Sequence, residues 1–227
     1  STLDVGPSSA LLRVGATLGT FSDHCMGANT ILNLSGCADD RIRFAVEVCV
    51  RCLDAASGTC KALILAPTVP VARQFHAIAQ LRDGLTASCV FGNAYVDSWT
   101  QPEWARHLNA IALLVTTPQL FLDALSAGHV DLRAFCVLVI DECHHCRGQH
   151  PFAMLFKEHF SWTGSGEHIR VLGLSSKMTK RQVKNASERQ QAIQQLERLM
   201  ASQVLEAGRS VQDNCAQSLP ASSGTNC

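Results

Sequence analysis

Short apolar runs alternate with longer segments of helical periodicity along most of this chain. Short apolar runs indicate buried strands, whereas apolar residues three or four positions apart indicate the buried face of a helix. Phe44, Val48 and Cys52, for example, recur at helical spacing within one such segment. The alternation predicts βαβ units, in which parallel strands form one sheet and helices cover it.

The pattern predicts where each element lies. Pro118 suits the first turn of a helix, Gly128 suits the end of the same helix, and Gly164-Ser165-Gly166 marks a turn. The predicted strands occupy residues 29–34, 61–66, 87–91, 111–115, 137–140 and 169–174. The predicted helices occupy residues 42–56, 71–81, 102–109, 118–127, 151–160 and 182–205.

The same pattern divides the chain into three parts. Residues 1–28 form an N-terminal segment ahead of the alternation, and residues 29–207 form the folded lobe. Residues 208–227 are rich in Ser, Gln, Asn and Gly, with few residues that could join a core. We therefore expect a disordered polar tail after the lobe.

Composition limits the classes of function. The 227 residues suffice for one α/β domain with a tail, and 19 basic residues balance 19 acidic residues. A neutral chain has no global field that would attract a nucleic acid or a membrane, so any basic binding surface must be local. No run approaches the ~20 apolar residues of a membrane span, and no signal peptide opens the chain. We expect no membrane partner and a cytoplasmic or nuclear location.

The chain carries 11 cysteines, whose spacing favours neither a disulfide framework nor zinc. Most are scattered through strand-like and helix-like segments, as small buried hydrophobic residues would be. Cys143-His144-His145-Cys146 is a single cluster, whereas a structural zinc site usually draws its ligands from two separated pairs. We interpret the cysteines as thiols in a reducing compartment.

Candidate chemistry follows the apolar run of residues 137–140, where Asp141 and Glu142 stand. Ligands in open α/β sheets gather beyond the carboxyl ends of the strands. There an aspartate can hold Mg²⁺ beside a triphosphate, and a glutamate can orient an attacking water. The alternative is a buried strand that ends in a solvated acidic turn.

Two further segments follow predicted strands and offer phosphate-binding groups. Backbone N–H groups and hydroxyls at a helix start can bind phosphate oxygens without reading a base sequence. Threonine and proline also begin helices routinely, so an ordinary helix start is the alternative for each segment. The candidate contacts to a nucleic-acid backbone are Pro67, Thr68, Thr116, Thr117 and Gln119.

Four segments in this order resemble the first RecA-like lobe of superfamily-2 helicases: residues 66–74, 115–119, 141–144 and 172–176. The resemblance is closest to the Dicer-like proteins of plants and algae. It implies an α/β, RecA-like three-layer fold with a mainly parallel sheet flanked by helices. It also implies double-stranded RNA as a partner, and a second helicase lobe or a ribonuclease region if the chain is part of a longer one.

The resemblance assigns roles to particular residues. Asp141 and Glu142 correspond to catalytic residues, with Asp141 as the ligand of Mg²⁺ whenever nucleotide binds. Ser175 and Ser176 correspond to the pair that couples the nucleotide site to the RNA site. ATP and Mg²⁺ are the implied cofactors. The complete DECH box is Asp141, Glu142, Cys143 and His144.

The chain departs from the family at the phosphate-binding loop. The family shows a glycine-rich loop that ends Gly-Lys-Thr, whereas residues 34–41 here read LSGCADDR. Asp40 stands at the lysine position and Arg41 at the threonine position. A unit charge about 4 Å from a phosphate contributes roughly 4 kcal/mol near a protein surface, so an aspartate there opposes binding. The degenerate ATP-binding positions are Ser35, Gly36, Asp40 and Arg41.

Three hypotheses follow. The first is a pseudo-ATPase lobe for RNA silencing, an RNA-contacting or docking platform with impaired ATP hydrolysis. Its RNA surface would include the basic residues between Arg170 and Arg198. The second is an active ATP-dependent RNA helicase lobe of a longer Dicer-like ribonuclease. The third is a protein-interaction module that binds no nucleic acid.

Overall fold

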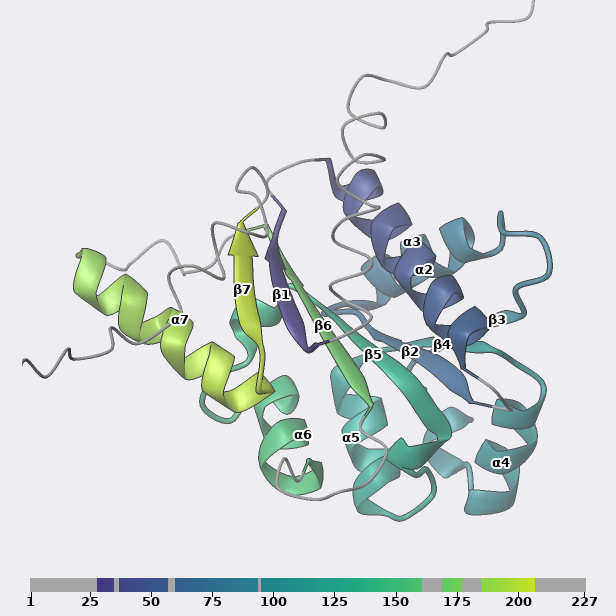
Figure 1. Ribbon diagram of the computed structural model, residues 1–227. Helices are drawn as coiled ribbons and strands as arrows, with labels where there is room; N and C mark the ends of the chain where they lie inside the picture. The colour runs from purple at the N-terminus through teal and green to yellow at the C-terminus, as the bar shows by residue number, and fades with distance from the viewer. Residues whose placement is uncertain are drawn as a thin grey trace, which may run out of the picture.

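The computed structural model describes residues 28–34, 37–56, 60–93, 95–160, 169–176 and 185–206. These residues form a three-layer α/β fold in which one sheet lies between two layers of helices (Figure 1). The fold class predicted from the alternation of apolar runs and helical segments is confirmed.

In the described ranges the sheet has seven strands, in the order β3-β4-β2-β5-β6-β1-β7. All of its pairings are parallel, so the carboxyl ends of the strands meet at one edge. The strands are β1 (Thr30–Asn33), β2 (Lys61–Leu65), β3 (Ala87–Val90), β4 (Leu113–Thr116), β5 (Phe135–Asp141), β6 (Arg170–Ser175) and β7 (Gln203–Glu206).

Among the described residues, two helices cover one face of the sheet and four cover the other (Figure 1). The first face carries α2 (Ala38–Ala55) and α3 (Val69–Ala79). The second face carries α4 (Gln101–Asn109), α5 (Pro118–Ser126), α6 (Pro151–His159) and α7 (Ala186–Met200). Short 3₁₀ turns, η1 (Val96–Ser98), η2 (Leu132–Ala134) and η3 (Cys143–His145), complete the lobe.

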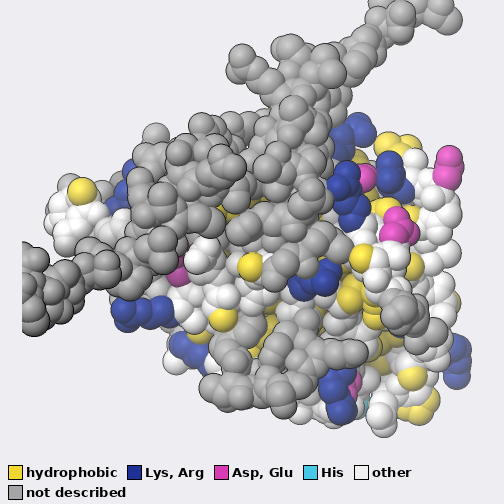
Figure 2. Space-filling view, viewed as in Figure 1, with side chains coloured by type: hydrophobic (Ala, Val, Ile, Leu, Met, Phe, Trp, Pro, Cys, Tyr) yellow, Lys and Arg dark blue, Asp and Glu magenta, His cyan; other side chains and the backbone are white. Residues whose placement is uncertain are grey.

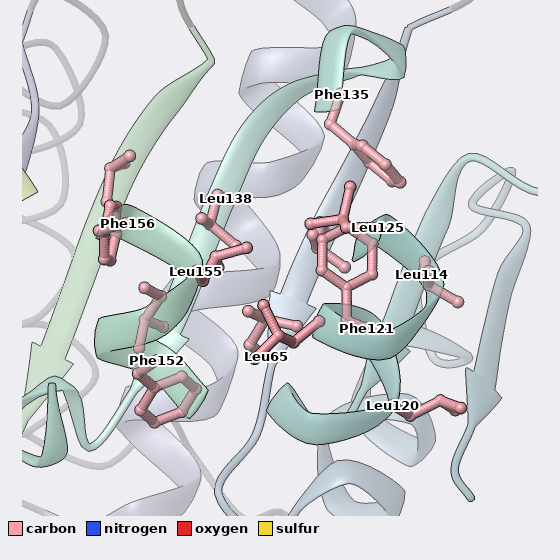
Figure 3. Close-up of a cluster of buried hydrophobic side chains, with 14 of the residues drawn as sticks. Leu65, Leu114, Leu120, Phe121, Leu125, Phe135, Leu138, Phe152, Leu155 and Phe156 are labelled. Carbon is pink, nitrogen blue, oxygen red and sulfur yellow. The ribbon is translucent and has the colours of Figure 1, made fainter. Parts of the chain in front are cut away.

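The alternation of side chains along the strands produces two cores. Leu63 and Leu65 of β2 join the core under α4 to α7, whereas Ala62 and Ile64 join the core under α2 and α3. Figure 3 shows aromatic and leucine side chains of α5 and α6 against the inner strands. Because both cores share one sheet, each inner strand is buried on both faces, as its uninterrupted apolar run predicts.

The structure differs from the sequence pattern at the last helix. A single helix was predicted over residues 182–205, but α7 ends at Met200 and Leu205 lies in strand β7. Ala201 takes the left-handed conformation, with a φ of 45°, and this turns the chain back toward β1. Leu205 is then buried in the core on the α2 and α3 side of the sheet, a tertiary placement that a helical count cannot foresee.

Helix α2 also begins earlier than residue 42, at Ala38, so Asp39, Asp40 and Arg41 belong to its first turn. The predicted turn at residues 164–166, residues 1–27 of the N-terminal segment and the polar tail of residues 208–227 lie outside the described residues. Among the helices in the described ranges, none combines the length and apolar character needed to cross a membrane.

Candidate functional site

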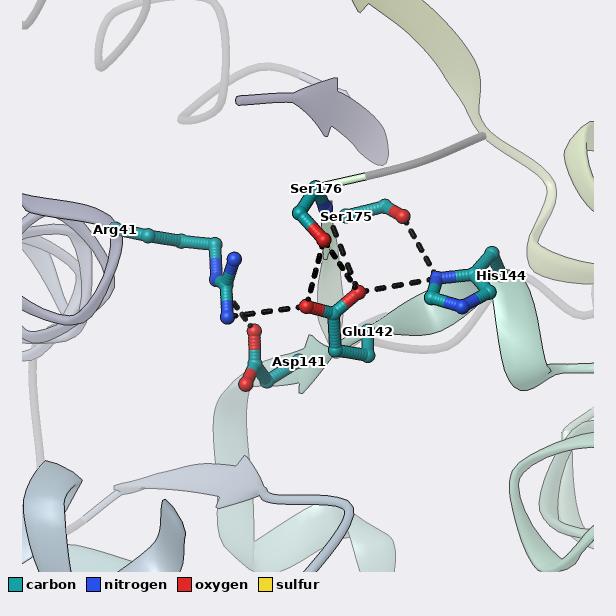
Figure 4. Close-up of polar contacts among 6 residues, drawn as sticks. All are labelled: Arg41, Asp141, Glu142, His144, Ser175 and Ser176. Atoms are coloured by element: carbon teal, nitrogen blue, oxygen red, sulfur yellow. Dashed lines mark hydrogen bonds and ion pairs between the residues drawn. The ribbon is translucent and has the colours of Figure 1, made fainter. Parts of the chain in front are cut away.

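Three segments that are distant in sequence meet at the carboxyl edge of the sheet (Figure 4). Strand β5 ends at Asp141 and is followed by Glu142, and strand β6 ends at Ser175 and is followed by Ser176. Arg41 reaches the same edge from the first turn of α2, which follows β1. Parallel pairing of β1, β6 and β5 brings these side chains together.

Arg41 forms ion pairs with both carboxylates of the acidic pair. Its Nε lies 2.8 Å from Asp141 Oδ1, and its Nη2 lies 3.1 Å from Glu142 Oε1. The Arg41 side chain is 10% exposed and the Asp141 side chain 1% exposed. An arginine at the position of the family's threonine therefore places an internal cation against the two acidic residues.

Glu142 is held in an unusual conformation by several contacts. Its φ of 52° and ψ of 46° are left-handed, a conformation that costs free energy for a residue with a side chain. The hydroxyl of Ser176 donates to Glu142 Oε1 at 2.9 Å. Burial alone would raise the pKa of Glu142, but contacts with His144, Arg41 and Ser176 together lower it to about 2. The carboxylate is therefore ionised at neutral pH.

His144 links the acidic pair to the end of β6. Its Nδ1 lies 3.1 Å from Glu142 Oε2 and 2.9 Å from the Ser175 hydroxyl oxygen. Because a carboxylate can only accept, Nδ1 carries the proton that is donated to Glu142. The predicted coupling residues Ser175 and Ser176 thus contact the DECH box, one through His144 and the other directly.

Asp141 differs from Glu142 in its electrostatic setting. Burial raises the pKa of the Asp141 carboxyl above its ordinary value, and the neighbouring Arg41 guanidinium only partly offsets this effect. The Arg41 contact is a close ion pair whose geometry departs from that of an aligned hydrogen bond. Arg41 is consequently the main described group that favours the ionised form of this buried carboxyl.

The amino terminus of α2 carries its own negative charge. A helix amino terminus attracts anions because its first N–H groups are unpaired and its dipole is positive there. Asp39 and Asp40 lie in this first turn, and the side chain of the N-cap residue Cys37 makes no capping hydrogen bond. The two carboxylates therefore stand where the family resemblance would place the phosphates of a nucleotide. Ser35 and Gly36 of the degenerate loop lie outside the described residues.

The predicted nucleic-acid contacts lie at the same edge. Thr68 and Thr117 are the N-cap residues of α3 and α5, and neither hydroxyl makes a capping hydrogen bond. Gln119 is exposed and donates to Asp123 Oδ1 at 2.8 Å, and Pro67 is half-buried. Thr116 is the exception. It is fully buried at the end of β4, so the surface contact predicted for this residue does not fit its position.

The described part of the face drawn in Figure 2 has no broad basic surface. Figure 2 shows Lys and Arg side chains spread over that face, without a continuous basic patch. Of the basic residues predicted to form an RNA surface, Lys177, Lys180, Arg181 and Lys184 lie outside the described residues. Arg189 is described and exposed, on α7.

The cysteines of the DECH region are buried thiols. Burial raises the pKa of Cys143 well above its ordinary value and raises the pKa of Cys146 to about 12. Both therefore stay protonated at neutral pH, which disfavours them as metal ligands. In the described ranges, no three or more His, Cys, Asp or Glu side chains are arranged to hold a metal ion.

A cavity of about 520 Å³ lies away from the acidic pair, between α4, α5 and the residues that precede β5. Lys61, His129 and His159 are among its lining residues. The acidic pair that the sequence singles out does not line this cavity. Asp141 and Glu142 lie at the opposite edge of the sheet.

The pairing of Arg41 with Asp141 and Glu142 could not be found by inspecting each segment alone. The sequence shows an acidic pair after one strand and an arginine after another, 100 residues earlier. The one available signal was the parallel topology, because it brings the carboxyl ends of all strands to the same edge.

The fold and the acidic pair define the class of protein. Residues 43–186 match the family model of the DEAD/DEAH box helicases, and the chain belongs to that family. It is similar to Endoribonuclease Dicer homolog 3 of Arabidopsis thaliana, with 37% identity over 151 residues. That alignment covers 66% of this chain and 10% of the relative. The resemblance to Dicer-like helicases seen in the sequence is thereby confirmed.

Other similarities agree with this assignment. Endoribonuclease Dicer homolog 2 of Arabidopsis thaliana is 30% identical over 148 residues, which cover 64% of this chain and 11% of the relative. The chain therefore spans about a tenth of the length of these relatives. The Hef helicase domain of Pyrococcus furiosus superposes with a TM-score of 0.67 at 17% identity, over 88% of this chain and 39% of that chain. This last likeness concerns the fold alone.

Proposed function

We propose that this lobe serves a Dicer-like RNA-silencing protein as an RNA-contacting or docking platform with impaired ATP hydrolysis. The observation that carries the proposal is the double ion pair of Arg41 with Asp141 and Glu142. These ion pairs support an interpretation in which residues of the chain itself already compensate the charges of the site. Both the acidic pair and the amino terminus of α2 have internal partners of opposite charge.

The residues present do not fit a complex of ATP with Mg²⁺. Such a complex needs a lysine for the phosphates and a hydroxyl for the metal, and Asp40 and Arg41 stand at those positions. Arg41 Nε lies 2.8 Å from Asp141 Oδ1, close enough to hinder a metal from approaching that oxygen. Asp39 and Asp40 repel a polyphosphate at the helix start. We therefore assign no step of hydrolysis to these residues.

The proposed RNA contacts rest on polar side chains at two helix starts. The hydroxyls of Thr68 and Thr117 make no capping bond, and Gln119 lies within the first turn of α5. Arg73 on α3 is exposed and stacks over Phe91, with its guanidinium carbon 4.9 Å from the ring centroid. Together these groups offer hydrogen bonds and one positive charge to a phosphate backbone.

Calorimetric titration with ATP and Mg²⁺ tests the nucleotide half of the proposal. We expect no saturable heat from the unchanged chain at millimolar nucleotide. The double variant Asp40→Lys and Arg41→Thr should bind at least tenfold more tightly, because it removes a repulsive charge and frees the acidic pair. Tight, magnesium-dependent uptake by the unchanged chain would contradict the proposal.

Filter binding of a short RNA duplex tests the other half. We expect affinity to fall steeply as salt rises, with a logarithmic slope of about 0.9 per phosphate contacted. The double variant Thr68→Val and Gln119→Ala should bind about tenfold more weakly, because it loses donors to charged oxygens. Gln80→Ala, at the far end of α3, is the matched control and should bind like the unchanged chain. Flat, negligible binding would favour a protein-interaction module.

One observation favours the active helicase lobe as a second candidate. Asp141 and Glu142 are both retained, and Glu142 is already positioned by Ser176 and His144. Release of phosphate from ATP in the presence of RNA would identify this function. That release should disappear in Glu142→Gln if the glutamate acts as the family resemblance implies.

A further inference from the structure

A second group of reactive side chains lies at the amino edge of the sheet, opposite the acidic pair. Cys60 directly precedes β2, and Cys136 is the second residue of β5. These two strands are neighbours, with Lys61 paired to Phe135 and Ala62 paired to Val137. Cys60 and Cys136 are both half-buried, so solvent reaches part of each residue.

An irregularity in the pairing of β2 with β5 places Cys136 beside the start of β2, next to Cys60 in the chain. The register shifts between Lys61 and Ala62, which leaves Cys136 as an extra residue between two paired positions. Cys136 and Val137 consequently face the same side of the sheet, the side covered by α2. The Cys136 thiol donates to the carbonyl oxygen of Lys61 at 3.4 Å, which places its sulfur beside the backbone of the residue that follows Cys60.

Neighbouring cysteines are less suited to reaction with a solvent-borne reagent. Cys49 and Cys52 project from α2 toward the same region, but both are buried. The sulfur of Cys52 also lies 4.0 Å from Nη1 of Arg170. Burial raises the pKa of Cys49 well above its ordinary value, so that thiol stays neutral and unreactive. Cys60 and Cys136 are therefore the accessible pair in this group.

We propose that Cys60 and Cys136 form a reversible disulfide, a redox modification site separate from the acidic pair. The co-reactant is a peroxide. In the first step the Cys60 thiolate attacks hydrogen peroxide, so that an S–O bond forms, the O–O bond breaks and hydroxide leaves to become water. In the second step the Cys136 sulfur attacks the resulting sulfenic sulfur, the S–O bond breaks, and the thiol proton leaves with hydroxide as water. Two thiols and one peroxide thus give one disulfide and two waters.

The order of the two steps follows from the surroundings of the thiols. Burial and the nearby Cys60 raise the pKa of Cys136 to about 12, so Cys136 is protonated at neutral pH and a poor first nucleophile. It suits the second step, because the sulfenic sulfur is then held beside it. The bond would join the connection between α2 and β2 to strand β5, and it would close a long loop that includes β2, β3 and β4.

Intact mass and peptide mapping test the proposal on the whole chain. After mild peroxide treatment we expect a mass loss of two hydrogen atoms and the loss of two alkylatable thiols, both reversed by dithiothreitol. Trypsin should then release residues 52–61 joined to residues 134–147. The oxidised protein should also unfold at a higher temperature than the reduced protein, because the crosslink restricts the unfolded chain.

Serine variants identify the two sulfurs within these peptides. Cys60→Ser and Cys136→Ser should each abolish the joined peptide and the shift in unfolding temperature. Cys52→Ser, in the same tryptic peptide as Cys60, should retain both effects, as should Cys89→Ser at a half-buried site on β3. Circular dichroism of the reduced variants checks that they fold. A joined peptide that persists in Cys60→Ser, or over-oxidation of Cys60 while Cys136 stays alkylatable, would overturn the proposal.

Discussion

At the scale of single residues, Arg41 decides the character of the site. It is the described cation that faces both Asp141 and Glu142, at 2.8 and 3.1 Å. A buried ion pair is weak evidence of net stabilisation, but removing one partner leaves an uncompensated charge. The stability of this edge should therefore depend on Arg41 more than on any exposed arginine of the same helix.

Arg41→Ala should destabilise the lobe by roughly 3 kcal/mol at pH 7, because Asp141 would remain buried without its cation. The pKa of Asp141 is already raised by burial, and losing Arg41 raises it further. A raised carboxyl pKa makes the ionised form costly, so the loss of stability should be full at neutral pH and should shrink as pH falls. Urea unfolding at pH 7 and pH 5 measures both effects. Arg43→Ala, which removes an exposed arginine of α2, is the control and should cost little at either pH.

Glu142 should contribute to stability in the opposite pH direction. Its pKa is about 2 in the folded lobe against an ordinary value of 4.5, an interval that corresponds to about 3 kcal/mol at most. A lowered carboxyl pKa stabilises the fold above the ordinary value, and this contribution is lost as pH falls from 4.5 toward 2. In Glu142→Gln, the free energy of unfolding should depend less on pH over that range, which urea unfolding at several acidic pH values measures. This low-pH part of the curve is its acid limb. An unchanged acid limb in the variant would show that other carboxyls dominate it.

At the scale of elements, β6 must pack unusually closely between β1, η3 and α7. A Cβ added at Gly173 would lie 2.9 Å from Met200 Cε, 3.0 Å from Cys143 Sγ and 3.1 Å from Ile31 Cγ1. The methionine end can move, but the cysteine and isoleucine atoms belong to a buried core. The glycine therefore keeps the DECH turn against the sheet.

Gly173→Ala should destabilise the lobe by about 1–3 kcal/mol, the usual cost of overpacking a core. Thermal unfolding followed by circular dichroism measures the loss. Gly92→Ala is the matched control, because its added Cβ meets only a flexible carboxylate oxygen of Asp97 at 3.3 Å. Equal effects of the two substitutions would refute the close packing at Gly173.

At the scale of the whole molecule, the parallel sheet separates two kinds of chemistry. Its carboxyl edge gathers Arg41, Asp141, Glu142 and Ser176, and its amino edge gathers Cys60 and Cys136. Strand β5 runs between the two edges and contributes to both. The disulfide proposed at one edge and the ion pairs at the other can therefore be tested with separate variants of the same lobe.

The sequence determined most of the architecture, because each inner strand is a short apolar run and each helix has an apolar face of its own. The acidic pair, the lost lysine and the changed threonine position were all visible as local patterns. The end of α7 was not, because Leu205 has helical spacing and only its burial in the core on the α2 and α3 side of the sheet favours a strand. The burial of Thr116 could not be predicted from the sequence either. Thr116 and Thr117 are neighbouring threonines at the end of one strand, and only the structure shows which of them faces the core.

Only the tertiary structure decided what the unusual residues do. Arg41 is distant in sequence from Asp141 and Glu142, and their ion pairs exist because parallel strands end at one edge. The approach of Cys136 to Cys60 likewise depends on a register shift between two strands. Local sequence fixes hydrophobic periodicity and residue chemistry, but charge pairing and thiol contact depend on distances across the sheet, which are set when the strands pair.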